Sequence, residues 1–191
     1  YLFFYDQLEK ANLMLQGVID HADEPMDSER VRFFFKNPLN DGGTFCGVSD
    51  LADKYGLVPA EVQPETFSAD NTSKMSSLLS SKLREFGLEL RKMVADGKKD
   101  AAIKARKTEM LSTIYNMLCL TLGEPVKEFT YTFKTKDGKP VGQPRKYTPK
   151  EFYEATVGGP VSGSFIMVMN DPRREYYKTY EVEYDRHTYD G

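Results

Sequence analysis

Two amphipathic patterns between Thr72 and Leu122 constrain the fold more than any other feature of this sequence. Apolar residues recur there at gaps of three, one and four, the spacing of the buried face of an α-helix. Gly97 separates the two patterns, and Gly123 with Pro125 ends the second. Two long helices with a short link predict an antiparallel helical hairpin. The residues predicted to face inward are Met75, Leu78, Leu79, Leu83, Phe86, Leu90, Met93, Val94, Ala101, Ala105, Leu111, Ile114, Tyr115, Leu118 and Leu122.

The same region has a surplus of positive charge. It carries ten Lys or Arg and five Asp or Glu between Thr72 and Glu109, whereas the whole chain has a net charge of −3. One interpretation is an ordinary solvated helical face, and the other is a basic surface for a partner protein or nucleic acid. The net charge of the whole chain excludes a generally basic, nucleic-acid-binding composition.

Helical signals also precede the hairpin. Residues 1–20 carry apolar side chains at helical spacing, and their first five positions are apolar all round, as in a buried helix. Residues 37–43 contain Asn, Pro, Asp and Gly together, which predicts a turn. Phe45–Tyr55 then predicts a second helix, for which Gly56 is a natural C-terminal cap.

Strand signals appear after the hairpin. Phe129–Lys134 alternates aromatic and polar residues, which predicts a half-buried strand. Thr148 and Glu151 have the spacing of a capping box at the start of a short helix. Ser164–Met169 is a continuous apolar run that predicts a buried strand, and the alternation in Tyr180–Tyr184 predicts a last one. The sequence therefore favours an α+β fold, with helices first and strands late.

Composition excludes several classes of function. Two Cys and two His in 191 residues give no disulfide framework and no zinc site. No phosphate-binding glycine loop or dinucleotide fingerprint is present, so we expect neither a metal nor a cofactor. The longest apolar runs have about five residues, far fewer than a membrane-spanning helix needs.

A cysteine nucleophile is one catalytic possibility. Cys46 follows a glycine turn close to a predicted helix N-terminus, a position that can lower the pKa of a thiol. His187 could act as its base in a cysteine hydrolase. The alternative is a small buried thiol at Cys46 and a surface histidine at position 187. Cys119 lies between two leucines and is predicted to belong to the core.

Several motifs resemble the bleomycin hydrolase and aminopeptidase C group of papain-like cysteine peptidases. The resemblance runs in order along nearly the whole chain. Its motifs are Tyr1–Asp6 with Leu8–Asn12, Asn37–Gly43, Asp53–Pro59, Pro64–Thr66, Lys82–Arg84, Leu90–Val94, Leu122–Pro125, Thr148–Pro149 with Glu151–Tyr153, and Asn170–Arg173.

The resemblance implies a partial papain-like fold with an inserted helical hook. Residues 1–69 would belong to the helical domain, residues 70–126 to the hook and residues 127–191 to a β-rich domain. Members of the family are thiol aminopeptidases that assemble as hexamers, with active sites facing an internal channel. A homo-oligomer and a peptide substrate are the partners that this implies, and cytoplasmic location is the family default.

The sequence also departs from the family pattern. The nucleophile of the family lies in a Cys-Trp pair upstream of the helix that Tyr1 begins, and this sequence has no Trp. The catalytic His and Asn of the family lie downstream of the last strand. Neither Cys46 nor His187 falls at a catalytic position. The chain begins with Tyr rather than Met, and we expect the central portion of a longer enzyme, inert alone.

One functional element does carry over. Gly42 and Gly43 match the wall of the papain-like site, where main chain pairs with an extended substrate. Gly43 would make the contact, while Asp41, Gly42 and Thr44 shape the loop. A tight turn before a helix is the alternative interpretation. A different function for the whole chain, a non-catalytic module that binds or assembles through the basic helical hairpin, also stays open.

Overall fold

The computed structural model describes residues 1–40, 42–168 and 170–180, and this part of the chain is mostly helical with one two-stranded antiparallel sheet. Its elements are α1 (Leu2–Asp20), α2 (Glu29–Lys36), α3 (Phe45–Tyr55), α4 (Phe67–Asp70), α5 (Ser73–Ala95), α6 (Asp100–Leu122), β1 (Phe129–Lys134), β2 (Pro140–Tyr147), α7 (Pro149–Val157) and the 3-10 turn η1 (Ser162–Ser164).

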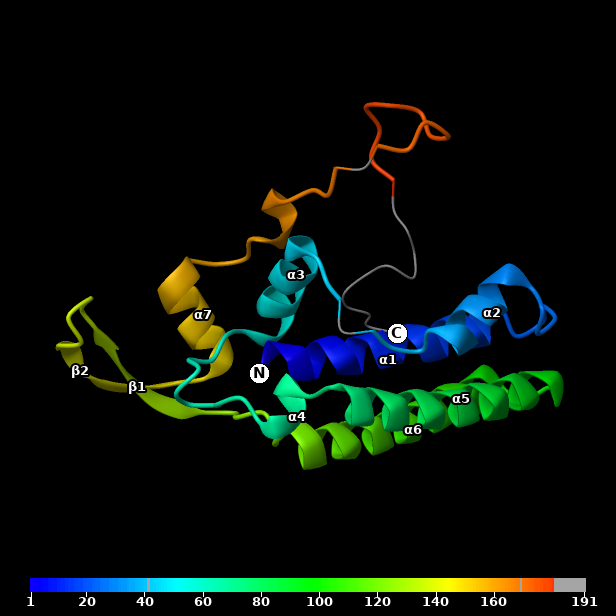
Figure 1. Cartoon of the computed structure of the whole chain (residues 1–191), viewed down its shortest axis with the longest axis horizontal. Helices are drawn as coiled ribbons and strands as arrows, with labels where there is room; N and C mark the ends of the chain where they lie inside the picture. Colours follow the sequence, from blue (N-terminus) through cyan, green and yellow to red (C-terminus); the bar gives the residue numbers. More distant parts are fainter. Residues whose placement is uncertain (41, 169, 181–191) are drawn as a thin grey trace.

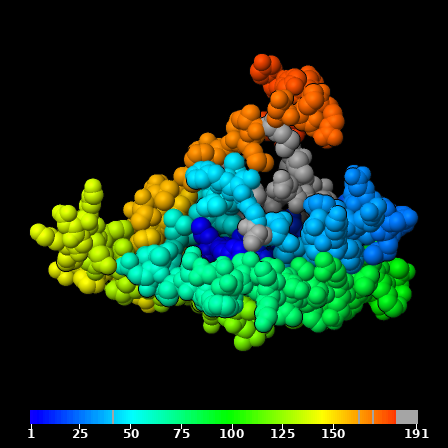
Figure 2. Space-filling model, in the orientation of Figure 1, coloured from blue at the N-terminus to red at the C-terminus, as the bar shows by residue number. Residues whose placement is uncertain are grey.

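The main core lies between α1 and the antiparallel hairpin of α5 and α6. The three long helices run side by side, and the hairpin forms one long side of the molecule (Figures 1 and 2). Residues from all three helices are buried in this core, which confirms the predicted hairpin. Its largest fully buried apolar side chains are Phe4, Leu15, Val18, Leu79, Leu83, Leu90, Met110, Ile114 and Leu118.

The buried face of α6 differs from the predicted one. Ala101 and Ala105 are exposed, whereas Ile103, Lys107 and Met110 are buried. Small apolar residues fit either face of a helix, so the two alanines do not indicate which face of the first turns of α6 is buried. The packing of α1 on the hairpin buries the Lys107 side of α6 instead. On α5, Leu78 was also predicted inward and is 62% exposed.

Helix α2 packs on α1 and α5 through two glycines. A Cβ at Gly17 would lie 2.5 Å from Cζ of Phe34, and one at Gly87 would lie 3.0 Å from Cζ of Phe35. Two arginines of α5 complete this arrangement: Arg84 donates to the carbonyls of Phe35 and Lys36, and Arg91 to those of His21 and Glu24. The contacts of Arg84 satisfy carbonyls in the last turn of α2, which have no partner within their own helix, and those of Arg91 hold the turn that follows α1.

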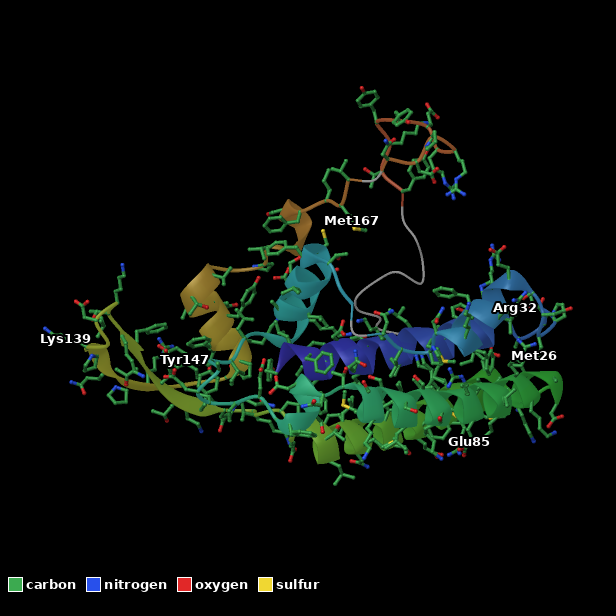
Figure 3. The ribbon with its side chains drawn as sticks, viewed as in Figure 1. Met26, Arg32, Glu85, Lys139, Tyr147 and Met167 are labelled. Atoms are coloured by element: carbon green, nitrogen blue, oxygen red, sulfur yellow. The ribbon has the colours of Figure 1, made fainter. Side chains whose placement is uncertain are left out.

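A second apolar cluster joins the sheet to α7. Phe129, Tyr147 and Phe152 form it, and Tyr147 lies at the base of the β-hairpin while Lys139 lies at its tip (Figure 3). The capping box of Thr148 and Glu151 at the start of α7 is confirmed. Gly56 ends α3 with a φ of 81°, and a Cβ there would lie 2.3 Å from the Pro149 carbonyl. This close approach requires glycine.

The predicted strand at Ser164–Met169 is wrong over the residues that the structure describes. Ser164 ends η1, and no described strand pairs with Phe165–Val168. Phe165 packs on Phe45 of α3 with ring centroids 4.7 Å apart, but Ile166 and Val168 are 78% and 88% exposed. An apolar run indicates burial, yet a strand also needs a neighbouring strand. Met169 and nearly all of the strand predicted from Tyr180 lie outside the described residues.

The buried ammonium of Lys107 predicts a pH dependence of stability. Its Nζ donates to Oε1 of Gln16 at 2.9 Å, and Gln16 donates to Asp20 at 2.7 Å. Burial lowers the pKa of Lys107 to about 8, while Asp20 opposes and Lys104 adds to that shift. An unfolded lysine titrates near pH 10.4, so the unfolded chain binds more protons than the folded chain between about pH 8 and 10. The contribution of Lys107 therefore makes the free energy of unfolding rise with pH across that window.

Lys107→Met removes this titration and the cost of burying the charge. We expect it to raise the free energy of unfolding at pH 7 by on the order of 2 kcal/mol and to flatten the rise between about pH 8 and 10. Urea denaturation at several pH values measures both quantities. The same pH profile in the variant and the wild type would contradict the assignment.

Candidate substrate-binding loop

Three polar side chains of α1 hold the loop that precedes α3. Nζ of Lys10 donates to the carbonyl of Asn40 at 3.0 Å, to that of Gly42 at 2.6 Å and to the Asp6 carboxylate at 2.7 Å. Nε2 of Gln7 donates to the same Asn40 carbonyl at 2.9 Å. Positions 6, 7 and 10 share one face of a helix, so α1 presents Gln7 and Lys10 to the loop, and Asp6 accepts from both of them.

Thr44 connects this loop to α3. Its Oγ1 accepts a hydrogen bond from the Gly47 amide at 3.3 Å, as a residue at a helix N-cap does. The chain is therefore fixed on both sides of Gly43, by Lys10 at Gly42 and by the helix cap at Thr44. Asp41, which was predicted to shape the loop, lies outside the described residues.

The two glycines are exposed, and the fold gives no local reason for glycine. Gly43 does not have a positive φ. Among the described residues, a Cβ at Gly43 would meet no atom within 4 Å, and one at Gly42 would meet only Oδ1 of Asn40 at 3.7 Å. The described contacts therefore show no steric requirement for glycine at Gly43, and the turn interpretation stays open, because the commonest turns need no positive φ.

The orientation of the Gly42–Gly43 peptide follows from its contact with Lys10. The Gly42 carbonyl points toward Lys10, and the described chain has no cis peptide bond. In a trans peptide the N–H points opposite to the C=O, so the Gly43 amide points away from α1. It donates to no other described residue. The loop thus presents an exposed main-chain donor from which no described residue accepts, which suits pairing with an extended peptide.

The two cysteines lie in different surroundings. Cys46 is half-buried in the first turn of α3, and its candidate partner His187 lies outside the described residues, so the structure does not test that pair. Cys119 is half-buried against the main core, in agreement with its predicted place there. Burial raises the pKa of the Cys119 thiol, which disfavours the thiolate that a nucleophile needs.

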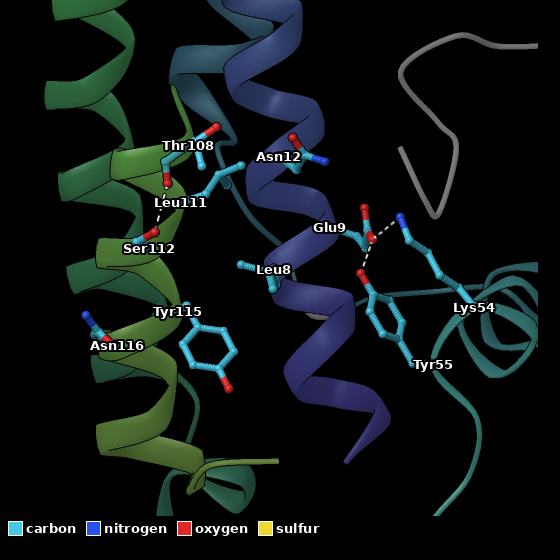
Figure 4. A pocket seen from close by; sticks show the side chains of 10 residues that line it. All are labelled: Leu8, Glu9, Asn12, Lys54, Tyr55, Thr108, Leu111, Ser112, Tyr115 and Asn116. Carbon is cyan, nitrogen blue, oxygen red and sulfur yellow. Dashed lines mark hydrogen bonds and ion pairs between the residues drawn. The ribbon is translucent and has the colours of Figure 1, made fainter. Parts of the chain in front are cut away.

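A cavity of about 530 Å³ lies between α1, α6 and the end of α3 (Figure 4). Glu9 on its wall is only 3% exposed, and its carboxylate accepts from Nζ of Lys54 at 2.9 Å and from the Tyr55 hydroxyl. No residue of the glycine loop lines it. The lining residues are Leu8, Glu9, Asn12, Lys54, Tyr55, Thr108, Leu111, Ser112, Tyr115 and Asn116. The Glu9 pair joins α1 to α3 and has a structural role.

Sequence reasoning missed Asp6, Gln7 and Lys10. Their signal is weak but present: polar residues interrupt a helix whose other face is apolar. Among the described residues, no group of three His, Cys, Asp or Glu could hold a metal ion. In the same part of the chain, no helix is both long enough and apolar enough to cross a membrane.

The chain is thus mostly helical, and an exposed stretch of its main chain lies beside the N-terminus of α3. The Peptidase C1-like family matches residues 1–191, and the chain belongs to this family of papain-like thiol peptidases. It is 37% identical over 186 residues to an aminopeptidase C of Lactobacillus delbrueckii, covering 96% of this chain. It is 36% identical over 190 residues to bleomycin hydrolase of Homo sapiens, again over 96% of this chain.

A solved structure agrees with these relatives. A crystal structure of PepW from Lactobacillus rhamnosis matches with a TM-score of 0.79 and 40% sequence identity, over 83% of this chain and 35% of that one. The chain spans 41% of the length of the curated aminopeptidase C and bleomycin hydrolase relatives named above. The resemblance found in the sequence is thereby confirmed at the level of the family.

Gly43→Ala tests whether the loop needs glycine for folding. We expect the free energy of unfolding to stay within about 1 kcal/mol of the wild type, because the added Cβ enters open space. Gly56→Ala is the matched control, and we expect it to lose about 2 kcal/mol or more through its positive φ and its clash with Pro149. Urea denaturation compares the two variants. Equal losses would favour the turn interpretation of Gly43.

Proposed function

We propose that the chain is the central portion of a cysteine aminopeptidase, which hydrolyses N-terminal peptide bonds by a thiol-dependent mechanism. Family membership and relatives named aminopeptidase C and bleomycin hydrolase support this proposal. In this account the catalytic Cys, His and Asn belong to other parts of the enzyme, and neither Cys46 nor His187 is catalytic. The chain contributes one wall of the substrate site.

The observation that carries the proposal is the outward-facing amide of Gly43. An enzyme that cleaves peptides must hold its substrate extended, and main-chain pairing does so without regard to the side chains of the substrate. Gly43 is exposed and offers that donor, from which no described residue accepts. Asp41, Gly42 and Thr44 would complete the wall, with Gly42 fixed by Lys10 and Thr44 by the start of α3.

The helical hairpin is the second proposed element. We assign residues 70–126, which contain α5 and α6, to the hook insertion of the family. Residues 1–69 then belong to the helical domain, and residues 127–191 to the β-rich domain, of which β1, β2 and α7 are the regular elements described. Assembly as a hexamer and cytoplasmic location stay predictions from the resemblance.

The alternative of a binding module gains no support from the hairpin. Six of its ten basic residues hydrogen-bond or pair with groups of the same chain, so these side chains help to hold the fold together. These residues are Lys82, Arg84, Arg91, Lys92, Arg106 and Lys107. No described contact favours the binding interpretation of the surplus over the solvated face, and we propose no second function.

Gly43→Trp in the longer enzyme tests the substrate wall. We expect the indole to occupy the space beside the Gly43 amide and to raise KM for peptides by roughly tenfold or more, the equivalent of one lost hydrogen bond with steric exclusion. Lys74→Trp, at the exposed start of α5, is the control and should leave KM unchanged. An unchanged KM in Gly43→Trp would contradict the proposal that Gly43 forms part of the substrate-binding wall.

The 191-residue chain alone should not hydrolyse an aminoacyl fluorogenic amide, because its cysteines do not occupy the catalytic position. The assay compares the chain before and after alkylation of its thiols, with the longer enzyme as the positive control. Hydrolysis that alkylation abolishes would make Cys46 or Cys119 catalytic and would contradict this part of the proposal.

A further inference from the structure

We propose that Lys10 is a positioning residue, which turns the Gly42–Gly43 peptide so that the Gly43 amide faces a bound peptide. The inference rests on the proposed substrate wall and adds a residue to it. The juxtaposition that carries it is the ammonium of Lys10 against the carbonyls of Asn40 and Gly42.

Contacts inside the protein account for the whole hydrogen-bonding capacity of Lys10. An ammonium has three N–H donors. Nζ lies 2.7 Å from the Asp6 carboxylate, 3.0 Å from the Asn40 carbonyl and 2.6 Å from the Gly42 carbonyl. The side chain is 18% exposed and that of Asp6 is 16% exposed. No donor of Lys10 is left for a ligand, so its role is to hold the loop.

Gln7 separates the two carbonyl contacts. It is fully buried, and its Nε2 donates to the Asn40 carbonyl at 2.9 Å and to Asp6 at 3.0 Å. The Asn40 carbonyl therefore has two donors, whereas among the described residues the Gly42 carbonyl is held by Lys10 alone. Loss of Lys10 would leave the start of the loop attached to α1 and would release the peptide between the two glycines.

Glycine makes that peptide easy to turn. A peptide bond between two glycines has no Cβ on either side to restrict its rotation, so both of its orientations are accessible. One orientation directs the Gly43 N–H outward, and the other directs the Gly42 carbonyl outward, where it would repel the carbonyl of a substrate. The charged contact with Lys10 selects the first orientation. A wall built from glycine thus needs an anchor such as Lys10.

The test uses the longer enzyme and three variants. We expect Lys10→Met to raise KM by roughly tenfold while kcat changes less than about twofold, because substrate binding loses one oriented donor. Lys10→Arg keeps the charge and the donors and should recover most of that loss. Lys54→Met is the matched control, since the described ion pair of Lys54 joins a different carboxylate of α1, that of Glu9, to α3. It should leave KM unchanged.

A substrate-side comparison separates positioning from general loosening of the fold. The test uses a series of competing peptides, each with one carbonyl reduced to a methylene. The peptide that lacks the carbonyl paired with Gly43 should bind the wild-type enzyme roughly tenfold more weakly than the unreduced peptide. The Lys10→Met variant should bind this peptide and the unreduced peptide about equally. If Lys10→Met does not fold, Lys10→Gln serves for the same comparison. An undiminished penalty in the variant overturns the role of Lys10.

The outcomes also distinguish this inference from the proposed function. An unchanged KM in Gly43→Trp removes the wall and with it any role for Lys10 in binding. A raised KM in Gly43→Trp together with an unchanged KM in Lys10→Met keeps the wall and overturns the positioning role alone.

Discussion

The packing of α1 against the α5–α6 hairpin is the interaction on which the rest of this structure depends. Phe4 and Leu15 of α1 are buried against the hairpin. A different face of the same helix presents Glu9 to the end of α3, and Lys10 holds the loop that leads into α3. Apolar burial therefore fixes the rotation of α1 about its axis, and that rotation decides where its polar side chains point. The packing of the core therefore places the loop contacts, and these contacts contribute little to the core itself.

The candidate site consists of main chain more than of side chains. Gly43 brings no chemical group beyond its amide, and the value of that amide depends on its direction. Lys10 on one side and the Thr44 cap on the other fix this direction. The same loop in an unanchored chain would present donors and acceptors in changing directions. This arrangement explains how two exposed glycines, which suit a flexible turn by composition, can form a defined surface.

Sequence reasoning was most successful where a local rule determines the structure. The two helices of the hairpin, the end of α3 at Gly56 and the capping box at Thr148 depend on residues close together in the chain, and all three are confirmed. It failed where distant segments decide. Burial of Lys107 depends on how α1 meets α6, and the apolar run after Ser164 has no described strand beside it. Lys10 was missed for the same reason, because its partners lie thirty or more positions away.

The most direct test of this account is hydrogen exchange at the Gly43 amide in the longer enzyme, with and without a bound peptide that resists cleavage. Gly97, in the turn between α5 and α6, provides an internal reference outside the loop. The account predicts that exchange at Gly43 slows markedly when the peptide binds, whereas exchange at Gly97 keeps its rate, because only the first amide gains an acceptor. Unchanged exchange at Gly43 under saturating peptide would contradict the central claim that this amide pairs with the substrate.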